Sequence, residues 1–164
     1  LVMLKALENI TEHMVLDIYG PIHDIKYWKL CKKVIETLPK HICVTYKGPI
    51  QGSHVPNLLN NYDFFVLLSE GENFGHAIIE ALSAGCPVLI SKNTPWKDLK
   101  RKQIGWDIET SEKETITRAF ENCMVMSENN YKQWSLKARE FADNVRTNTH
   151  IVSQSKSLLL NYIN

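Results

Sequence analysis

The segment from Ser69 to Gly75 (SEGENFG) combines residue types that suit a phosphorylated ligand. It comes after a short apolar run, and a helical pattern begins directly after it. The first backbone N–H groups of a helix have no partner inside the helix, so they favour an anion such as phosphate. Gly71 and Gly75 have no Cβ atom, which lets a ligand approach the backbone closely. The segment therefore predicts a helix N-terminus that binds phosphate.

Two glutamates accompany this segment. Glu72 lies in the loop, where its carboxylate can accept hydrogen bonds from hydroxyl groups, and Glu80 comes eight residues later. Eight residues at about 100° each end about 80° beyond two full turns, so the carboxylates share one broad side and lie roughly 8–12 Å apart. That separation is too large for an acid/base pair acting on one bond and suits two ends of an extended ligand. Taken alone, Glu80 would be an ordinary exposed helix residue, and Glu70 a solvated loop acid.

Five short apolar runs predict the strands that position these residues. Each has about five residues and is rich in β-branched or aromatic types. The middle runs are apolar at nearly every position, which indicates burial on both faces, as in a parallel sheet. The runs cover 15–19, 42–47, 63–68, 87–91 and 104–108.

Helical patterns separate the strands. Helices are expected at the start of the chain and at 25–38, 55–62, 74–84 and 95–102, and three more come after Thr110, the last at 152–162. Gly85 suits a helix C-cap, Thr94 with Pro95 a helix start, and Ser111 with Glu114 a capping box. This order predicts a doubly wound, Rossmann-like α/β domain with a parallel sheet of about five strands and C-terminal helices. Ligands of such folds bind at the carboxyl ends of the strands.

Composition excludes several functions. The chain has 164 residues and a net charge of +1, which gives no electrostatic footprint for nucleic acid. No apolar stretch reaches the roughly 18–20 residues that span a bilayer. The histidines lack metal-binding spacing, and no CxxC pair exists, so the cysteines are expected to be buried free thiols. They are Cys31, Cys43, Cys86 and Cys123.

The stretch from Glu72 to Val88 (ENFGHAIIEALSAGCPV) resembles the Glu-x7-Glu motif of retaining glycosyltransferases with the GT-B fold, especially family 4. Residues 55–59 (VPNLL) and 63–69 (DFFVLLS) are similar to the segments that lead into this motif. Residues 94–99 (TPWKDL) and the pair Gly105-Trp106 are similar to the segments on its C-terminal side. The resemblance runs in the right order from 15 to about 109.

The resemblance implies a role for each matching position. Glu72 would be the catalytic-site residue that contacts hydroxyls of the donor sugar, and Glu80 would hold the ribose of the nucleotide. Gly20 would let the diphosphate approach the first strand. The backbone N–H groups after Glu72 would face the sugar and the diphosphate, and the loop after the second strand would lie against the base. The residues of these two segments are Asn73, Phe74, Gly75, His76, Lys47, Gly48 and Pro49.

The resemblance also implies what accompanies the chain. The diphosphate-binding Arg and Lys of the family are expected upstream of Leu1, together with a first strand and an N-terminal acceptor domain. Residues 1–164 would then be the C-terminal, nucleotide-sugar-binding domain, inactive alone, of an enzyme of polysaccharide biosynthesis. The substrate would be a nucleotide-diphosphate sugar, with no cofactor, metal or nucleic acid. The enzyme would be cytoplasmic, with a peripheral membrane contact as an option.

Two other functions fit the same residues. A GT-B-type epimerase would also bind a nucleotide sugar but would isomerise it. A non-catalytic nucleotide-binding module would use the same fold without chemistry. The sequence does not choose the sugar, the base, the acceptor or the oligomeric state, because those depend on a few loop contacts and on residues outside this chain.

Overall fold

Five parallel strands form the centre of the molecule in a computed structural model, which describes residues 1–147. The predicted helix at 152–162 lies outside the described residues. All five predicted strands and the α/β class are confirmed, and only the third strand is clearly shorter than predicted. The strands are β1 (Met14–Tyr19), β2 (Ile42–Gly48), β3 (Phe65–Leu67), β4 (Val88–Ser91) and β5 (Gly105–Ile108).

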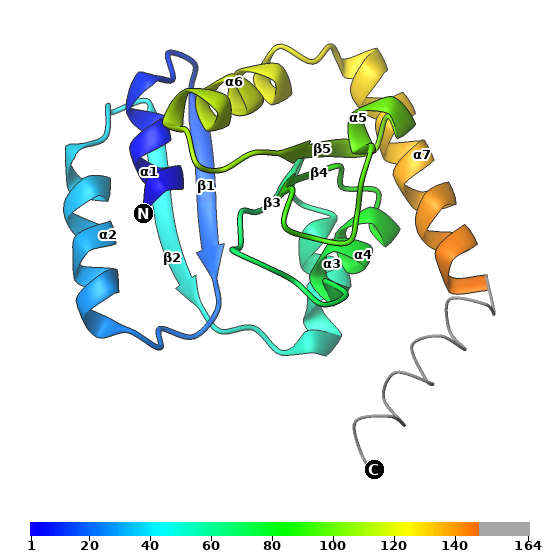
Figure 1. The fold of residues 1–164 in the computed structure, drawn as a ribbon, viewed down its shortest axis with the longest axis horizontal. Coiled ribbons are helices and arrows are strands. Elements are labelled where there is room, and N and C mark those ends of the chain that lie inside the picture. Colours follow the sequence, from blue (N-terminus) through cyan, green and yellow to red (C-terminus); the bar gives the residue numbers. More distant parts are fainter. Residues whose placement is uncertain (148–164) are drawn as a thin grey trace.

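The strands form two sheets rather than one. β1 pairs with β2, and β3, β4 and β5 form a three-stranded sheet in that order, with every pairing parallel (Figure 1). In residues 1–147, no strand pairs with the second edge of β1 or with the second edge of β3.

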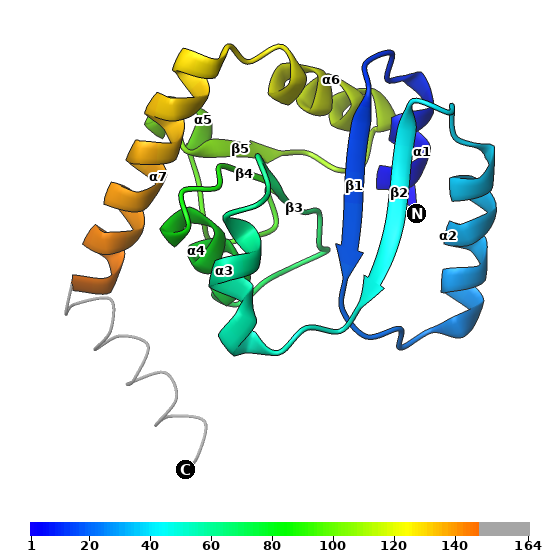
Figure 2. The same ribbon diagram turned by 180° about the vertical axis from the view of Figure 1, so that it is seen from behind.

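Helices surround both sheets. In Figures 1 and 2, α2 lies outside the two-stranded sheet, α3, α4 and α7 lie by the three-stranded sheet, and α6 crosses near the start of β1. Within residues 1–147, no helix is both long and apolar enough to cross a bilayer. The helices are α1 (Val2–Ala6), α2 (Ile25–Thr37), α3 (Val55–Leu59), α4 (His76–Ser83), α5 (Leu99–Lys102), α6 (Lys113–Met124) and α7 (Glu128–Thr147); short 3-10 turns cover Leu7–Asn9 and Gly52–His54.

Gly85 ends α4 as predicted. It adopts a left-handed conformation with φ +77°, and its N–H donates to the carbonyl of Leu82 at 2.9 Å. A Cβ atom at Gly85 would come within 2.5 Å of Nε of Arg139 on α7. A glycine at this position therefore allows the left-handed end of α4 and also the close approach of α7.

The predicted start of α5 at Thr94-Pro95 is wrong. α5 begins at Leu99, whose N–H donates to Oδ1 of Asp107 on β5 at 2.9 Å. Thr94 forms a turn instead, with its Oγ1 accepting from the N–H of Trp96 at 3.3 Å. A carboxylate from another strand thus caps the helix, which local sequence could not indicate.

The predicted capping box at Ser111 and Glu114 is also wrong. α6 begins at Lys113 with Glu112 at its N-cap, and no side chain of the described residues caps it. Ser111 lies one residue before that N-cap. Ile116, Phe120 and Cys123 follow one another at spacings of four and three residues and form a buried face of α6.

β4 lies between two hydrophobic clusters. Its four residues are all buried, and Leu89 belongs to the cluster that includes α1 and α6. Val88 and Ile90 belong to the cluster that includes α4 and α7. Gly105 of β5 approaches β4 so closely that a Cβ atom would lie 2.1 Å from the carbonyl oxygen of Val88.

The cysteine prediction is wrong at one position. Cys31, Cys86 and Cys123 are buried free thiols, whereas Cys43 is exposed. Cys43 lies on β2, which has a strand neighbour on one edge only in the part of the chain that the structure describes.

We expect Gly105→Ala to lower the free energy of unfolding by more than about 3 kcal/mol, because the new methyl group would collide with backbone and φ is +152°. Gly52→Ala is the matched control, since a Cβ atom there meets nothing within 4 Å. Urea unfolding measures both variants. Equal stabilities would contradict the described packing of β5 on β4.

At pH 8 we expect a thiol reagent such as DTNB to modify Cys43 quickly and to reach Cys86 and Cys123 only upon unfolding. Burial is the main cause that raises the pKa of both buried thiols to about 12 from the usual 9.0. The folded protein therefore favours the protonated thiols. Their contribution to stability is complete below pH 9 and is lost as the pH rises towards 12. Rapid modification of all cysteines in the folded protein would contradict this.

Candidate ligand site at the carboxyl ends of the strands

The loop 69–75 ends in a left-handed glycine that starts α4. Gly75 is buried and has φ +75° and ψ 59°, and a Cβ atom on it would lie 2.8 Å from Cδ1 of Ile78. α4 begins at His76, two residues later than predicted. The N–H of Ile78 donates to the carbonyl of Gly75 at 2.9 Å. The N–H groups before Ile78 thus form the open first turn, as expected for an anion-binding helix start.

Trp96, which lies outside this loop in the sequence, contacts the loop at Phe74. Its indole Nε1 donates to the carbonyl of Phe74 at 2.6 Å, and the two rings meet edge to face with centroids 5.3 Å apart. The Phe74 ring also lies against the ring of the exposed His76, at 4.9 Å. In the sequence, Trp96 stands out only as part of the stretch 94–99 that resembles the family. The polar indole group was the one available signal, because a buried indole N–H usually finds an acceptor.

Glu72 is tied to the end of β4 through its backbone. Its N–H donates to the carbonyl of Asn93 at 3.3 Å, and its side chain is partly buried. Glu70 and Asn73 are exposed on either side of it. The Ser69 hydroxyl is buried without a hydrogen-bond partner among residues 1–147.

A cavity of about 430 Å³ lies between β1 and β3 and extends to the residues that follow the carboxyl ends of β1 and β2. Three predicted site residues from separate segments meet on its wall, namely Gly20 after β1, Pro49 after β2 and Glu80 on α4. Ala77 from the first turn of α4 also lines it. The other predicted residues do not line this cavity. Glu72, Asn73, Phe74, Gly75 and His76 form the adjoining loop and helix start, and Lys47 and Gly48 end β2.

The carboxyl ends of β1 and β2 are fixed to each other. The Gly20 N–H donates to the carbonyl of Gly48 at 3.0 Å, and the Tyr46 hydroxyl donates to the carbonyl of Gly20 at 2.7 Å. Lys47 is exposed, and its Nζ lies 3.6 Å from Oδ2 of Asp17. The Lys47 side chain is thus directed at β1.

Tyr62 connects β1 to the segment before β3. Its hydroxyl donates to Oδ2 of Asp17 at 2.6 Å and lies 2.9 Å from the hydroxyl of Tyr19. Burial, together with the hydrogen bond to Asp17 as the next largest cause, raises the pKa of Tyr62 well above its ordinary value. Tyr62 therefore remains a neutral hydrogen-bond donor at physiological pH.

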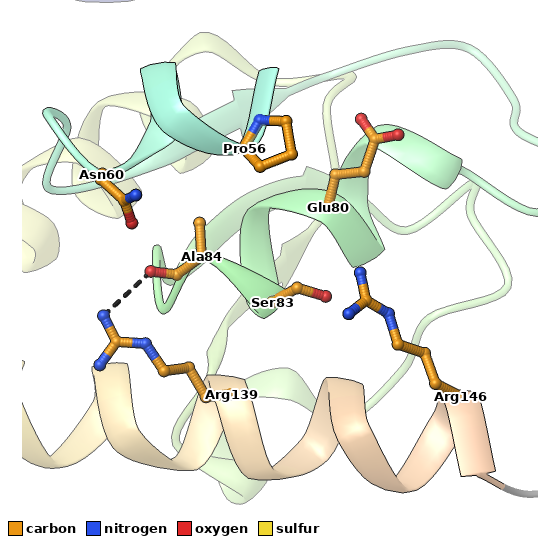
Figure 3. Close-up of a pocket in the computed structure, with 7 residues that line it drawn as sticks. All are labelled: Pro56, Asn60, Glu80, Ser83, Ala84, Arg139 and Arg146. Carbon is orange, nitrogen blue, oxygen red and sulfur yellow. Dashed lines mark hydrogen bonds between the residues drawn. The ribbon is translucent and has the colours of Figure 1, made fainter. Parts of the chain in front are cut away.

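Glu80 also faces a second pocket, of about 360 Å³, between α4 and α7. Figure 3 shows Arg139 and Arg146 of α7 directed at α4, with Nη2 of Arg139 donating to the carbonyl of Ala84 at 3.1 Å. No functional signal in the sequence marks this helix. The seven-residue spacing places both arginines on one face, but it does not reveal that this face lines a pocket together with Glu80.

Within residues 1–147, no cluster of three His, Cys, Asp or Glu side chains could hold a metal ion. The polar groups of the site are the two glutamates, the open backbone of α4 and the strand ends. This set can accept hydrogen bonds from hydroxyls through carboxylates and can donate them to an anion through N–H groups.

Comparison with known proteins identifies the class. The architecture matches the C-terminal domain of glycosyltransferases with the GT-B fold, as the resemblance implied. The sequence profile described as glycosyl transferases group 1 matches residues 2–141, so the chain belongs to that family. No curated protein sequence matches the chain significantly.

Solved structures share the fold at low identity. Anabaena HepE in complex with UDP-glucose is 19% identical with a TM-score of 0.73, over 95% of this chain and 44% of that one. Sucrose-phosphate synthase from Thermosynechococcus elongatus is 17% identical with a TM-score of 0.69, over 99% and 41%. The catalytic domain of the cholesterol-α-glucosyltransferase from Helicobacter pylori is 16% identical with a TM-score of 0.65, over 87% and 86%. The chain spans less than half the length of the first two.

We expect Trp96→Phe to loosen the loop 69–75, because it removes the bond to the Phe74 carbonyl but keeps most of the ring packing. Loss of this hydrogen bond should lower the local stability of the loop by about 1 kcal/mol. Hydrogen exchange of peptides covering the loop should then be faster. Trp134→Phe, at a ring that packs on Trp106 instead, is the control. Unchanged exchange in Trp96→Phe would show that the indole N–H does not position the loop.

Proposed function

We propose that this chain binds the nucleotide-sugar donor of a retaining glycosyltransferase that moves the sugar to an acceptor hydroxyl. The observation that carries the proposal is the meeting of Gly20, Pro49 and Glu80 around one cavity at the carboxyl ends of β1 and β2. Ligands of doubly wound folds bind at such strand ends. Membership of a glycosyltransferase family supports the same conclusion.

Glu80 is proposed to hold the ribose. Glu80 lies on the second turn of α4, is partly buried and lines the cavity. A carboxylate can accept hydrogen bonds from two neighbouring hydroxyls, such as those of a ribose. The loop at Lys47, Gly48 and Pro49 would then lie against the base, since it comes directly at the end of β2.

The start of α4 is proposed to face the diphosphate and the sugar. The backbone N–H groups at Phe74, Gly75 and His76 offer positive partial charge where the helix begins. Gly20 has no Cβ atom, and a Cβ atom there would meet nothing within 4 Å, so the space for a diphosphate is free. Glu72, with Asn73 beside it, would contact the sugar hydroxyls.

Transfer itself needs residues beyond this chain. We propose that an acceptor-binding domain and the Arg and Lys that neutralise the leaving diphosphate belong to the polypeptide upstream of Leu1. Positioning and electrostatic stabilisation of the leaving group would supply the catalysis. A nucleotide-diphosphate sugar would be the substrate, and the enzyme would act in the cytoplasm or at the inner face of the membrane.

The test measures binding of UDP-, GDP- and ADP-sugars by calorimetry, with ligand-observed NMR for weak binding. We expect the sugars of one nucleotide to bind to this chain with a Kd in the millimolar range. The same ligands should bind more tightly to a polypeptide that includes the upstream residues. Glu80→Gln should weaken that binding by about 10-fold or more, because ribose hydroxyls lose a charged acceptor.

Glu70→Gln is the matched control and should leave affinity unchanged, since Glu70 is exposed in the loop before α4. If no nucleotide sugar binds to either polypeptide, the proposal is overturned. Equal affinity of the Glu80→Gln variant and the unaltered chain would remove Glu80 from the site. Isomerised donor in the absence of acceptor would favour an epimerase instead.

A further inference from the structure

Only four polar side chains line the cavity between β1 and β3. They are Asp17, Tyr19, Tyr62 and Glu80, and the other lining residues are apolar, glycine or proline. Asp17 and Glu80 contribute carboxylates, which accept hydrogen bonds and have no proton to donate. The groups that the cavity can bind therefore depend on the directions of the two tyrosine hydroxyls.

The hydroxyl proton of Tyr62 belongs to Asp17. The Tyr62 hydroxyl donates to Oδ2 of Asp17 at 2.6 Å, and Nζ of Lys47 lies 3.6 Å from the same oxygen. A hydroxyl group has a single hydrogen to donate. Tyr62 therefore cannot also donate to the hydroxyl of Tyr19, which lies 2.9 Å away.

Tyr19 must be the donor in its pair with Tyr62, and this leaves its own oxygen free to accept. Within residues 1–147, no other group forms a hydrogen bond with the Tyr19 hydroxyl. The two rings meet edge to face, with centroids 6.3 Å apart and planes at 84°, and both residues are partly buried. The order Tyr19 to Tyr62 to Asp17 thus fixes the Tyr19 oxygen as an acceptor.

The polar side chains of the cavity consequently offer acceptors alone. Pro21 and Pro49, which line it beyond the ends of β1 and β2, have no backbone N–H to add. A phosphate would bring further acceptors and negative charge next to Asp17 and Glu80. A neutral group with its own hydroxyl protons, such as the diol of a ribose, matches this lining instead.

We propose that Tyr19 is a second ribose-binding residue, whose oxygen accepts a hydrogen bond from one ribose hydroxyl while Glu80 accepts from the other. Tyr62 and Asp17 are positioning residues that hold the Tyr19 hydroxyl in its accepting direction. The diphosphate stays outside the cavity, at the start of α4. The proposal rests on the donor binding proposed above, and it makes Tyr19 a residue that selects ribonucleotides over deoxyribonucleotides.

The test measures the Kd of UDP, GDP and ADP, and of their 2′-deoxy and 3′-deoxy forms, by ligand-observed NMR with the 164-residue chain. Tyr19→Phe should raise the Kd of the best-binding ribonucleotide by about 5-fold, because one hydroxyl loses its acceptor. The same substitution should leave the Kd of one of the two deoxy forms unchanged, because that ligand lacks the hydroxyl that donates to Tyr19.

Tyr62→Phe tests the positioning role. It releases the proton of Tyr19, so the affinity ratio of the ribonucleotide to that deoxy form should fall by at least about 2-fold. General loosening of the fold would weaken both ligands equally and would not change this ratio. In a chain that already carries Tyr19→Phe, adding Tyr62→Phe should leave the ratio as it is. Tyr131→Phe on α7, outside the cavity lining, is the matched control and should leave every Kd unchanged.

The outcomes separate this proposal from donor binding. If the ribonucleotide binds Tyr19→Phe as tightly as the unaltered chain, or if the substitution weakens the ribonucleotide and both deoxy forms alike, Tyr19 does not contact the ribose and donor binding still stands. If no nucleotide binds to this chain or to the longer polypeptide, both proposals are overturned. A loss confined to ligands that carry one particular hydroxyl would support Tyr19 as its acceptor.

Discussion

The burial of β4 on both faces is the constraint on which the rest of the structure depends. Val88, Leu89 and Ile90 have no exposed surface and separate two hydrophobic clusters. Each face of a buried strand must be covered by apolar side chains, so α6 and α1 are required on one side and α4 with α7 on the other. Gly105 is the corresponding requirement on β5, because only a residue without Cβ fits against Val88.

The position of the candidate site depends on β4. The chain leaves β4 through Asn93, whose carbonyl accepts from the Glu72 N–H, and continues to Trp96, which holds the Phe74 carbonyl. The loop before α4 is therefore supported at two points by residues about twenty positions later in the sequence. A helix start held in this way presents its open N–H groups in a fixed direction, which is what binding of an anion requires.

Much of this was accessible from the sequence, and the exceptions share a cause. Apolar runs identified all five strands, and Gly85 identified the end of α4, because those signals are local. The start of α5 was mispredicted because its cap is Asp107, a residue from the next strand. Cys43 was assigned to the core because its neighbours are apolar, but successive side chains of a strand point to opposite faces of the sheet, and Cys43 is exposed.

Residue types at fixed spacings are enough to predict the order of elements, the Glu-x7-Glu segment and the glycosyltransferase family. The three-dimensional structure was needed to show that Gly20, Pro49 and Glu80 share one cavity, that Tyr62 connects to Asp17, and that the strands divide into two sheets. These facts depend on how far-separated segments pack. Local periodicity encodes which side of an element is apolar, but it does not encode which other element covers that side.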